Sequence, residues 1–180
     1  MIKERELLSQ DDISITIERL CQQLIEKHDN FNDTIIIGVQ PRGVLLSNRL
    51  INNLQSFLNI VIKSGNIDIS FYRDDLRRRE HPILPQVMDM DMTIENKNVI
   101  LIDDVLYTGR SIRSALDALM AFGRPKSVEL LTLINRRFSR ELPIEPNYVG
   151  RTIDILETEK VIVEWNEING RDRVLMQKMD

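Results

Sequence analysis

Short aliphatic runs that alternate with stretches of helical spacing constrain the fold of this chain more than any other feature of its sequence. Three such runs predict buried strands, at residues 34–39 (TIIIGV), 99–102 (VILI) and 127–134 (SVELLTLI). Helical spacing of apolar side chains predicts helices from Ser9 to about His28, from Val44 to about Leu54, and over residues 111–123. Because alternating strands and helices are joined by right-handed crossovers, the sequence predicts an α/β fold, with a mainly parallel twisted sheet and helices on both faces.

Weaker signals fill the rest of the chain. Further strands are expected at residues 59–65 (NIVIKSG), 67–72 (IDISFY) and 160–165 (KVIVEW). The segment 73–98 is polar, contains two prolines and has no clear period. Because loops longer than about 15 residues in compact domains are usually functional or mobile, we expect a flexible loop at about 74–96. No internal repeat or linker is visible, so we expect one domain over residues 1–180.

Composition limits the partners and the compartment of this protein. Its 24 Lys and Arg against 28 Asp and Glu give a net charge of −4, which does not point to a nucleic-acid-binding protein, although it leaves room for a local basic face. Cys21 is the only cysteine, so a disulfide framework and a cysteine metal site are excluded. The charged N-terminus has no apolar signal core, and no apolar run approaches the roughly 20 residues that span a bilayer. We therefore expect a cytoplasmic protein.

The stretch VILIDDVLYTGRS, residues 99–111, carries the clearest chemical pattern. Asp103 and Asp104 follow an apolar strand, and carboxylates there can accept hydrogen bonds from sugar hydroxyls or hold Mg²⁺. Gly109 lets successive N–H groups converge, and Thr108, Ser111 and the start of the next helix add donors for a phosphate. Together these groups suit a phosphorylated ribose, although an Asp-Asp pair alone is more often a solvated turn or a helix cap.

Two competing nucleotide-binding motifs are missing from the sequence. It has no GxxxxGK[ST] stretch, and no lysine lies between residues 99 and 111, which argues against a P-loop. The first predicted strand leads into GVQPRG rather than GxGxxG, which argues against dinucleotide binding.

The same stretch resembles the signature with which type I phosphoribosyltransferases bind phosphoribosyl pyrophosphate (PRPP). Other segments, among them IIGVQPRG, GNIDISFYRDDL and TEKVIVEWNEINGRDRV, resemble the PyrR family. The resemblance implies a type I phosphoribosyltransferase fold with a small hood from the terminal regions. It also implies transfer of the phosphoribosyl group from PRPP to uracil. This reaction gives UMP and pyrophosphate, with Mg²⁺ as cofactor. The family further regulates pyrimidine (pyr) operons by UMP-responsive binding to leader mRNA, and it forms homodimers or higher homo-oligomers.

The resemblance also assigns roles to individual residues. Asp103, Asp104 and Arg42 would be catalytic, with the two aspartates on the ribose hydroxyls or Mg²⁺. The 5′-phosphate would be held within Val105, Leu106, Tyr107, Thr108, Gly109, Arg110 and Ser111. Pyrophosphate would meet Pro41, Arg42, Arg73 and Arg77, and the flexible loop would close over the site. The nucleotide would contact Arg136 and Val161, with Val161 facing the base through backbone groups.

The regulatory role leaves more alternatives open. RNA binding draws on Lys and Arg, and the candidates here are Arg19, Lys27 and Arg140, although a solvated helix face is the better explanation of Arg19 and Lys27 taken alone. Pro41 stands where PyrR regulators carry a threonine, and INRRFSREL replaces a pattern closer to V-D-R-G-H-R-E-L. The alternatives are a nucleotide-sensing RNA regulator with little catalysis, an enzyme without an RNA role, and a purine phosphoribosyltransferase.

No histidine is placed to act as an obvious general base. His28 and His81 are both expected on the surface. Tyr107 either faces the ribose or packs against its neighbours.

Overall fold

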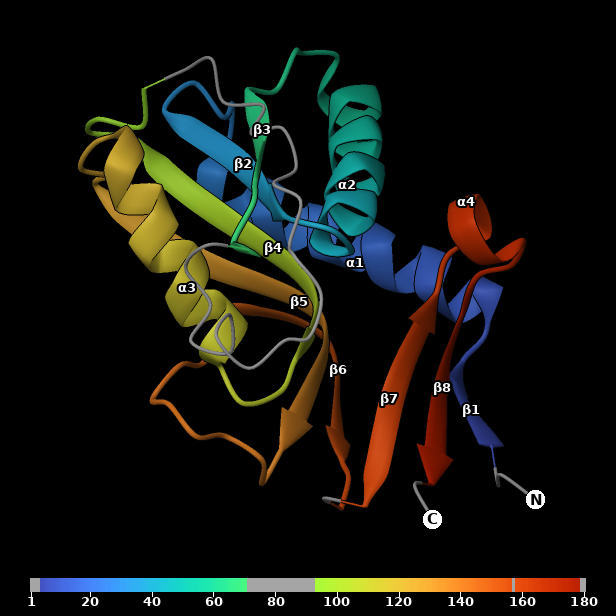
Figure 1. Ribbon diagram of the computed structural model, residues 1–180. Helices are drawn as coiled ribbons and strands as arrows, with labels where there is room; N and C mark the ends of the chain where they lie inside the picture. Colours follow the sequence, from blue (N-terminus) through green and yellow to red (C-terminus); the bar gives the residue numbers. More distant parts are fainter. Residues whose placement is uncertain (1–3, 71–92, 157, 179–180) are drawn as a thin grey trace.

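The computed structural model describes residues 4–70, 93–156 and 158–178, and its centre is a five-stranded parallel sheet (Figure 1). The strands, in spatial order, are β3 (Ser64–Ile67), β2 (Thr34–Val39), β4 (Asn98–Leu106), β5 (Ser127–Arg137) and β6 (Tyr148–Asp154). Every adjacent pair is parallel. The central strands are almost wholly buried because helices cover both faces of the sheet, which is why they consist of aliphatic runs. The predicted α/β fold is confirmed.

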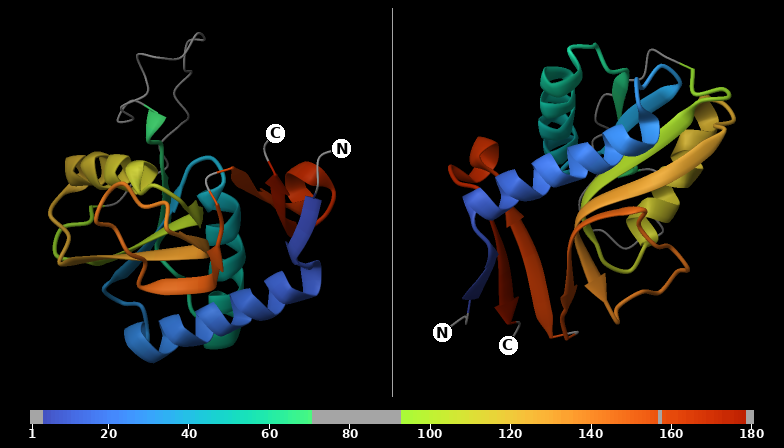
Figure 2. Two further views of the ribbon diagram at one scale, coloured as in Figure 1. Left: turned by 90° about the horizontal axis from the view of Figure 1, so that it is seen from below. Right: turned by 180° about the vertical axis from the view of Figure 1, so that it is seen from behind.

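Three helices cover the sheet: α1 (Gln10–His28), α2 (Gly43–Leu58) and α3 (Arg110–Leu119), the last followed by a short 3₁₀ helix at Met120–Phe122. Helices α1 and α2 pack on one face and α3 on the other, as the views from below and behind show (Figure 2). Alternate residues of a strand serve opposite faces: Ile36 and Ile100 join the core under α1 and α2, whereas Ile35 and Val99 join the core under α3. None of the helices in these described segments is long and apolar enough to span a membrane.

The start of α1 follows directly from the sequence. Ser9 is the N-cap, its side chain accepts a hydrogen bond from the Asp12 N–H, and the Asp12 carboxylate accepts one from the Ser9 N–H. This reciprocal capping box satisfies two N–H groups that the helix leaves unpaired. The apolar stripe of α1 then buries Ile13, Ile17 and Leu20 against the sheet.

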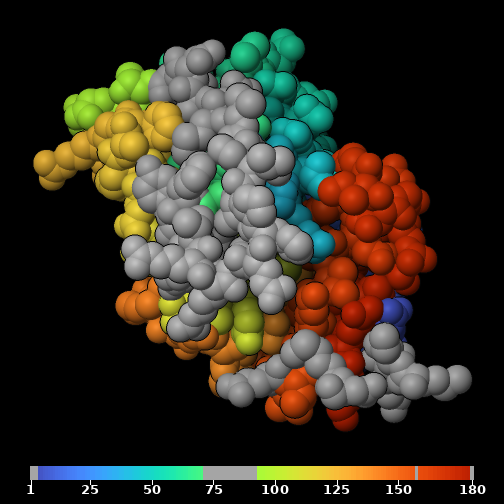
Figure 3. Space-filling view, viewed as in Figure 1, coloured from blue at the N-terminus to red at the C-terminus, as the bar shows by residue number. Residues whose placement is uncertain are grey.

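A second, antiparallel sheet lies beside the first and is called the hood here (Figure 1). It consists of β1 (Glu4–Leu8), β8 (Arg173–Lys178) and β7 (Glu159–Glu164), with the short helix α4 (Asn166–Asn169) between β7 and β8. Strand β8 is central and pairs with β1 on one side and β7 on the other. In the space-filling view, the red atoms of the hood adjoin the cyan atoms at the start of α2 (Figure 3).

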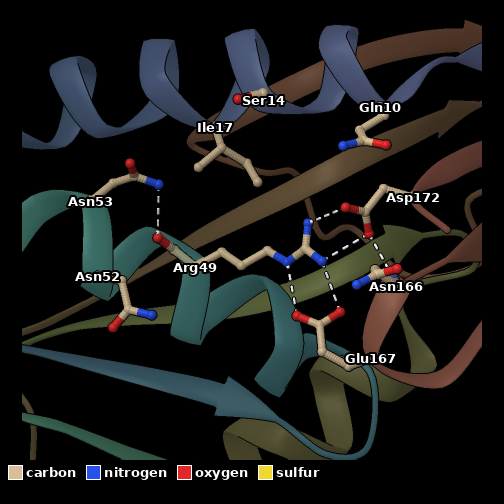
Figure 4. Close-up of a pocket in the computed structure, with 9 residues that line it drawn as sticks. All are labelled: Gln10, Ser14, Ile17, Arg49, Asn52, Asn53, Asn166, Glu167 and Asp172. Atoms are coloured by element: carbon tan, nitrogen blue, oxygen red, sulfur yellow. Dashed lines mark hydrogen bonds and ion pairs between the residues drawn. The ribbon is translucent and has the colours of Figure 1, made fainter. Parts of the chain in front are cut away.

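One arginine fastens the hood to the larger sheet. Arg49 of α2 donates two hydrogen bonds to Asp172, at 2.9 and 2.8 Å, and two to Glu167, at 3.1 and 2.7 Å (Figure 4). Its guanidinium also lies 4.7 Å from the centroid of the buried Trp165 ring. A polar pocket of about 370 Å³ surrounds this arrangement, between α1, α2 and the hood. The carboxylates of Asp172 and Glu167 are therefore already paired with Arg49. We interpret this pocket as part of the contact between the two sheets.

Several element boundaries differ from those expected. Strand β3 covers 64–67 rather than 59–65, because α2 continues to Leu58 and ends at Asn59 in the left-handed conformation. The described part of 67–72, up to residue 70, adds no strand beyond Ile67. Strands β1, β6 and β8 were not predicted at all. Strand β4 extends four residues past the predicted end at 102, so Asp103 and Asp104 lie within the strand.

Candidate functional site

The polar segments singled out in the sequence meet at the carboxyl edge of the parallel sheet. QPRG follows β2, the two aspartates lie in the last half of β4, and a glycine turn joins β4 to α3. Carboxyl ends of parallel strands share one edge of a sheet, where ligands of α/β proteins usually bind. The structure therefore brings these segments together from positions more than 60 residues apart.

Gly43 explains how Arg42 comes close to the aspartates. A Cβ atom on Gly43 would lie 2.2 Å from the Ile102 carbonyl oxygen and 3.1 Å from the Asp103 Cα. Only glycine allows the start of α2 to approach β4 so closely. As a result Pro41, whose peptide bond with Gln40 is cis, and Arg42 line a pocket of about 260 Å³ together with the two aspartates and Ser111.

Asp104 carries a buried carboxyl group at the edge of the site. The residue is only 6% exposed, and its Oδ2 atom has no hydrogen-bond partner among the residues that the structure describes. Burial raises the pKa of the Asp104 carboxyl, and the positive charge of Arg42 opposes that rise. Asp103 is half-buried and accepts a hydrogen bond from the Asp104 N–H at 3.0 Å. A buried carboxylate oxygen without a donor suits a hydroxyl or a metal ion supplied by a ligand.

The glycine turn beside the aspartates forms a second hollow, of about 280 Å³, which is lined by Asp103 and by residues between Val105 and Ser114. Gly109 has a φ angle of +90°, which side-chain-bearing residues rarely adopt, and α3 begins at the next residue, Arg110. The Thr108 hydroxyl accepts a long hydrogen bond of 3.4 Å from the Arg110 N–H. The positive end of α3 therefore opens onto the hollow.

The residues of the predicted phosphate-binding stretch, 105–111, do not all line the hollow in the same way. The Leu106 side chain belongs to the core under α3, and Val105 packs against the core on the opposite face. Both belong to β4, so they reach a ligand mainly with backbone groups, whereas 107–111 form the turn itself.

Tyr107 and Arg136 form a stacked pair at the rim of the site. The Arg136 guanidinium carbon lies 3.9 Å from the centroid of the Tyr107 ring, which is 41% exposed. Arg136 itself is buried in β5 and donates to the Glu159 carbonyl oxygen of β7 at 3.1 Å. Burial lowers the pKa of Arg136, and its interactions with Tyr107 and Glu159 counter that effect. The Tyr107 ring thus packs against Arg136 while the residue stays accessible, and its contact with the ribose stays a prediction.

Val161 lies on β7, the hood strand that Arg136 contacts through Glu159. Its side chain is buried in the core under α1 and α2, so it offers a ligand only backbone groups. Among the residues that the structure describes, β7 pairs only with β8, and its other edge faces the larger sheet (Figure 1).

Each of the three candidate RNA-contacting residues has partners within the chain. Arg19 donates to the carbonyl oxygens of Val149 and Gly150, at 3.2 and 2.6 Å. Lys27 forms an ion pair of 2.8 Å with Glu129. Arg140 is turned inward, toward the glycine turn of the candidate site.

The flexible loop expected at about 74–96 falls mostly outside the described residues, as do Arg73, Arg77 and His81. Its last residues, 93–96, lie against the 3₁₀ helix, where the Ile94 N–H donates to the Phe122 carbonyl oxygen at 3.4 Å. Ile94 is fully buried.

The prediction that His28 lies on the surface is wrong. Its side chain is only 5% exposed, because the last turn of α1 reaches the amino edge of the sheet. There its Nδ1 lies 3.1 Å from the Thr34 hydroxyl, and its Nε2 lies 3.1 Å from both Glu129 and the Tyr148 hydroxyl. This network stands at the edge opposite to the candidate site. Within the described residues, no group of three or more His, Cys, Asp or Glu side chains is arranged for a metal ion.

Sequence comparison identifies relatives over nearly the whole chain. Residues 4–167 match the family described as phosphoribosyl transferase domain. The bifunctional protein PyrR of Enterococcus faecalis is 39% identical over 175 residues, which covers 97% of both chains. The bifunctional protein PyrR of Microcystis aeruginosa is 42% identical over 173 residues, covering 96% of this chain and 97% of the relative.

Solved structures share the fold at lower identity. A hypoxanthine-guanine phosphoribosyltransferase from Bacillus anthracis superposes with a TM-score of 0.73 at 19% identity, covering 99% of both chains. A hypoxanthine phosphoribosyltransferase from Staphylococcus aureus gives 0.70 at 22% identity, covering 95% of this chain and 90% of the other. The fold is therefore that of the phosphoribosyltransferases, and the sequence identity over its full length places this chain in the PyrR family.

Proposed function

We propose that this protein is a uracil phosphoribosyltransferase, which converts uracil and PRPP to UMP and pyrophosphate, and that it also binds pyr leader mRNA in response to UMP. The observation that carries the enzymatic part is the meeting of three features at one sheet edge. A buried acidic pair, an arginine after β2 and a glycine turn at the start of α3 line two adjoining pockets. These features match the hydroxyls, the leaving group and the phosphate of PRPP in turn.

The acidic pair would serve the ribose. Departure of pyrophosphate leaves positive charge on the sugar ring, and two carboxylates beside that ring stabilise the charge as it develops. Asp104 supports this role best, because its buried Oδ2 lacks a donor within the described residues and would gain one from a ribose hydroxyl.

Mg²⁺ fits the same residues as a companion of PRPP. Carboxylate oxygens are the ligands that Mg²⁺ prefers, and protein sites usually supply only one or two of them, with substrate oxygens and water completing the shell. Asp103 and Asp104 would hold the ion, directly or through water. The ion would supply charge neutralisation for the leaving pyrophosphate.

Arg42 and the glycine turn would hold the two ends of PRPP. Arg42 lines the pocket that contains the aspartates, where its guanidinium suits the pyrophosphate oxygens. The 5′-phosphate would lie in the hollow of residues 107–111, against the N-terminus of α3. Pro41, Arg73 and Arg77 are proposed as further pyrophosphate contacts, and the loop at 74–96 as the cover that excludes water.

The base would lie between the two sheets, where Arg136 meets β7. Backbone groups of Val161 on the open edge of β7 suit the amide-like edge of uracil. We further propose that the protein acts in the cytoplasm as a homodimer or a higher homo-oligomer, and that residues 1–180 form one domain.

Incubation of the purified protein with labelled uracil, PRPP and Mg²⁺ tests the enzymatic proposal. UMP is the expected product, and the Asp103→Asn/Asp104→Asn double variant should lose turnover while its circular dichroism spectrum stays unchanged. A wild-type protein that forms no UMP would refute the proposed activity and favour a nucleotide-sensing regulator. Competition by hypoxanthine or guanine that exceeds competition by uracil would favour a purine substrate.

A gel shift with the pyr leader RNA of the same organism tests the regulatory part. Binding is expected to strengthen with UMP and to weaken as salt rises, because phosphate contacts dominate RNA affinity. An RNA affinity that depends neither on UMP nor on the leader sequence would contradict the regulatory role. Only the enzymatic part of the proposal would then remain.

A further inference from the structure

The chain between β5 and β6 contains a segment that holds the glycine turn from behind. Residues 139–145, called the brace here, run beside the turn between β4 and α3 (Figure 1). The brace contacts this turn with its backbone, with apolar side chains and with two charged side chains. None of these contacts involves the acidic pair.

Backbone groups of the brace fix one carbonyl of the turn. The N–H groups of Glu141 and Leu142 both donate to the Thr108 carbonyl oxygen, at 3.0 and 3.2 Å. Leu142 and Ile144 also close the space beside Gly109, since a Cβ atom there would lie 3.5 Å and 3.4 Å from them. The turn therefore rests on a packed surface.

The Arg140 side chain fixes the preceding carbonyl. One guanidinium nitrogen donates to the Tyr107 carbonyl oxygen, and the other donates to Asn135 Oδ1 at 2.7 Å. Glu145 lies 3.7 Å from the guanidinium Nε. The Arg140 side chain is only 16% exposed, so its positive charge interacts mainly with groups of the protein.

A neighbouring ion pair ties the brace to the start of α3. Arg110 donates to the Glu141 carboxylate at 2.6 Å, and both side chains are about half exposed. Exposed pairs of this kind contribute little energy, so the main restraint comes from the two fixed carbonyls.

The two fixed carbonyls determine where two N–H groups point. In a trans peptide the C=O and the following N–H lie in one plane and point in opposite directions. Fixing the Tyr107 carbonyl thus orients the Thr108 N–H, and fixing the Thr108 carbonyl orients the Gly109 N–H. Because both carbonyls bond to the brace, both N–H groups point away from it. Thr108 and Gly109, which carry these N–H groups, line the hollow.

We infer that Arg140 is a positioning residue for phosphate binding: it holds the glycine turn so that the N–H groups of Thr108 and Gly109 converge on the 5′-phosphate of the substrate. The inference rests on the proposed function for the identity of the substrate. It gives Arg140 a role behind the glycine turn, where its guanidinium contacts the Tyr107 carbonyl oxygen. Asn135 supports Arg140 from β5.

The Arg140→Met variant tests this role through the two Michaelis constants. The KM for PRPP should rise by about tenfold or more, because preorganised N–H donors are lost, while the KM for uracil changes less than about twofold. Arg140→Lys should recover part of the loss, since one donor can still reach the Tyr107 carbonyl oxygen. Asn135→Asp should stay close to wild type, since it keeps the acceptor for Arg140.

Arg137→Met is the matched control, because Arg137 lies in the same stretch but pairs with Asp154 on the surface. Both constants should match wild type in this control. Equal rises of the KM for PRPP and for uracil in folded Arg140→Met, or no rise of either, would overturn the positioning role.

Direct binding separates this inference from the proposed activity. Calorimetry should show that Arg140→Met weakens the binding of UMP by about tenfold or more. The binding of uridine should weaken much less, because uridine lacks the phosphate. If the wild-type protein forms no UMP yet the variant shows this difference, the activity is refuted and the positioning role stands. If the wild-type protein turns over and the variant weakens UMP and uridine equally, the positioning role alone is refuted.

Discussion

Arg49→Met should loosen the hood and lower the stability of the protein by about 3 kcal/mol. The pair with Asp172 is largely sheltered, since that carboxylate is 11% exposed, and charged hydrogen bonds in such places contribute about 1.5–3 kcal/mol. The pair with Glu167 is 45% exposed on the glutamate side and adds only about 0.5 kcal/mol. The stacking on Trp165 adds about 0.5–1 kcal/mol.

Thermal and urea unfolding measure this loss. For a domain of this size, about 3 kcal/mol corresponds to a fall in Tm of roughly 6–12 °C. Arg113→Met is the matched control, because Arg113 forms an exposed pair with Asp117 one turn along α3, which is worth about 0.3–0.5 kcal/mol. Loss of stability in Arg49→Met that stays within 1 kcal/mol of this control would refute the idea that Arg49 fastens the hood.

The same pair predicts a dependence on pH. Arg49 lowers the pKa of Glu167, and it lowers that of Asp172 in spite of burial, which acts in the opposite direction. Groups whose pKa falls on folding contribute stability that is complete above their unfolded pKa values, near 4, and is lost as pH drops through the folded values. The Tm difference between wild type and Arg49→Met should therefore be constant from pH 6 to 8 and shrink below about pH 4. A difference that grows on acidification would contradict the assignment.

Three further substitutions or labels probe other parts of the molecule. Gly43→Ala should destabilise the protein by about 1–3 kcal/mol and lower turnover, because the new Cβ would lie 2.2 Å from the Ile102 carbonyl oxygen; an unchanged Tm would contradict this close approach. Tyr148→Phe should cost about 1.5–3 kcal/mol in urea unfolding, because Glu129 loses a hydrogen bond of 2.6 Å. Burial raises the pKa of the Cys21 thiol to about 12, so a thiol reagent at pH 8 should modify the native protein only as it unfolds, and immediate labelling would show that Cys21 is accessible.

The parts of the fold that the sequence predicted are those that local chemistry determines. The aliphatic strands, the Ser9 capping box and the glycine turn each carry their signal within a dozen residues. The run NIVIKSG misled because apolar residues alone do not make a strand: Asn59 caps α2, and Val61 is 90% exposed. Pairing with β2 begins only at Ser64.

The hood strands β1 and β8 were missed for the opposite reason. In β1 and β8 exposed and buried positions mix, and many side chains are charged, so neither has the aliphatic run of a central strand. Their stability comes from pairing with each other and with β7, across a separation that no local pattern reports.

The candidate site shows the same contrast between local sequence signals and long-range contacts. Its acidic pair and glycine turn were predictable as a motif, but the inward course of Arg140 depends on the fold of the β5–β6 connection. The burial of His28 likewise depends on Glu129 and Tyr148, which reach it from strands about 100 residues further along the chain.

The pairing of β1 with β8 gives the hood the longest separation in sequence of any strand pair in the described structure. The strands of the parallel sheet all lie within residues 34–154, whereas β1, at residues 4–8, pairs only with β8, at residues 173–178, among the described residues. Contacts between residues far apart in the chain form slowly, because the long loop between them must first be closed. When the chain refolds, the hood should therefore assemble after the parallel sheet beside which it lies.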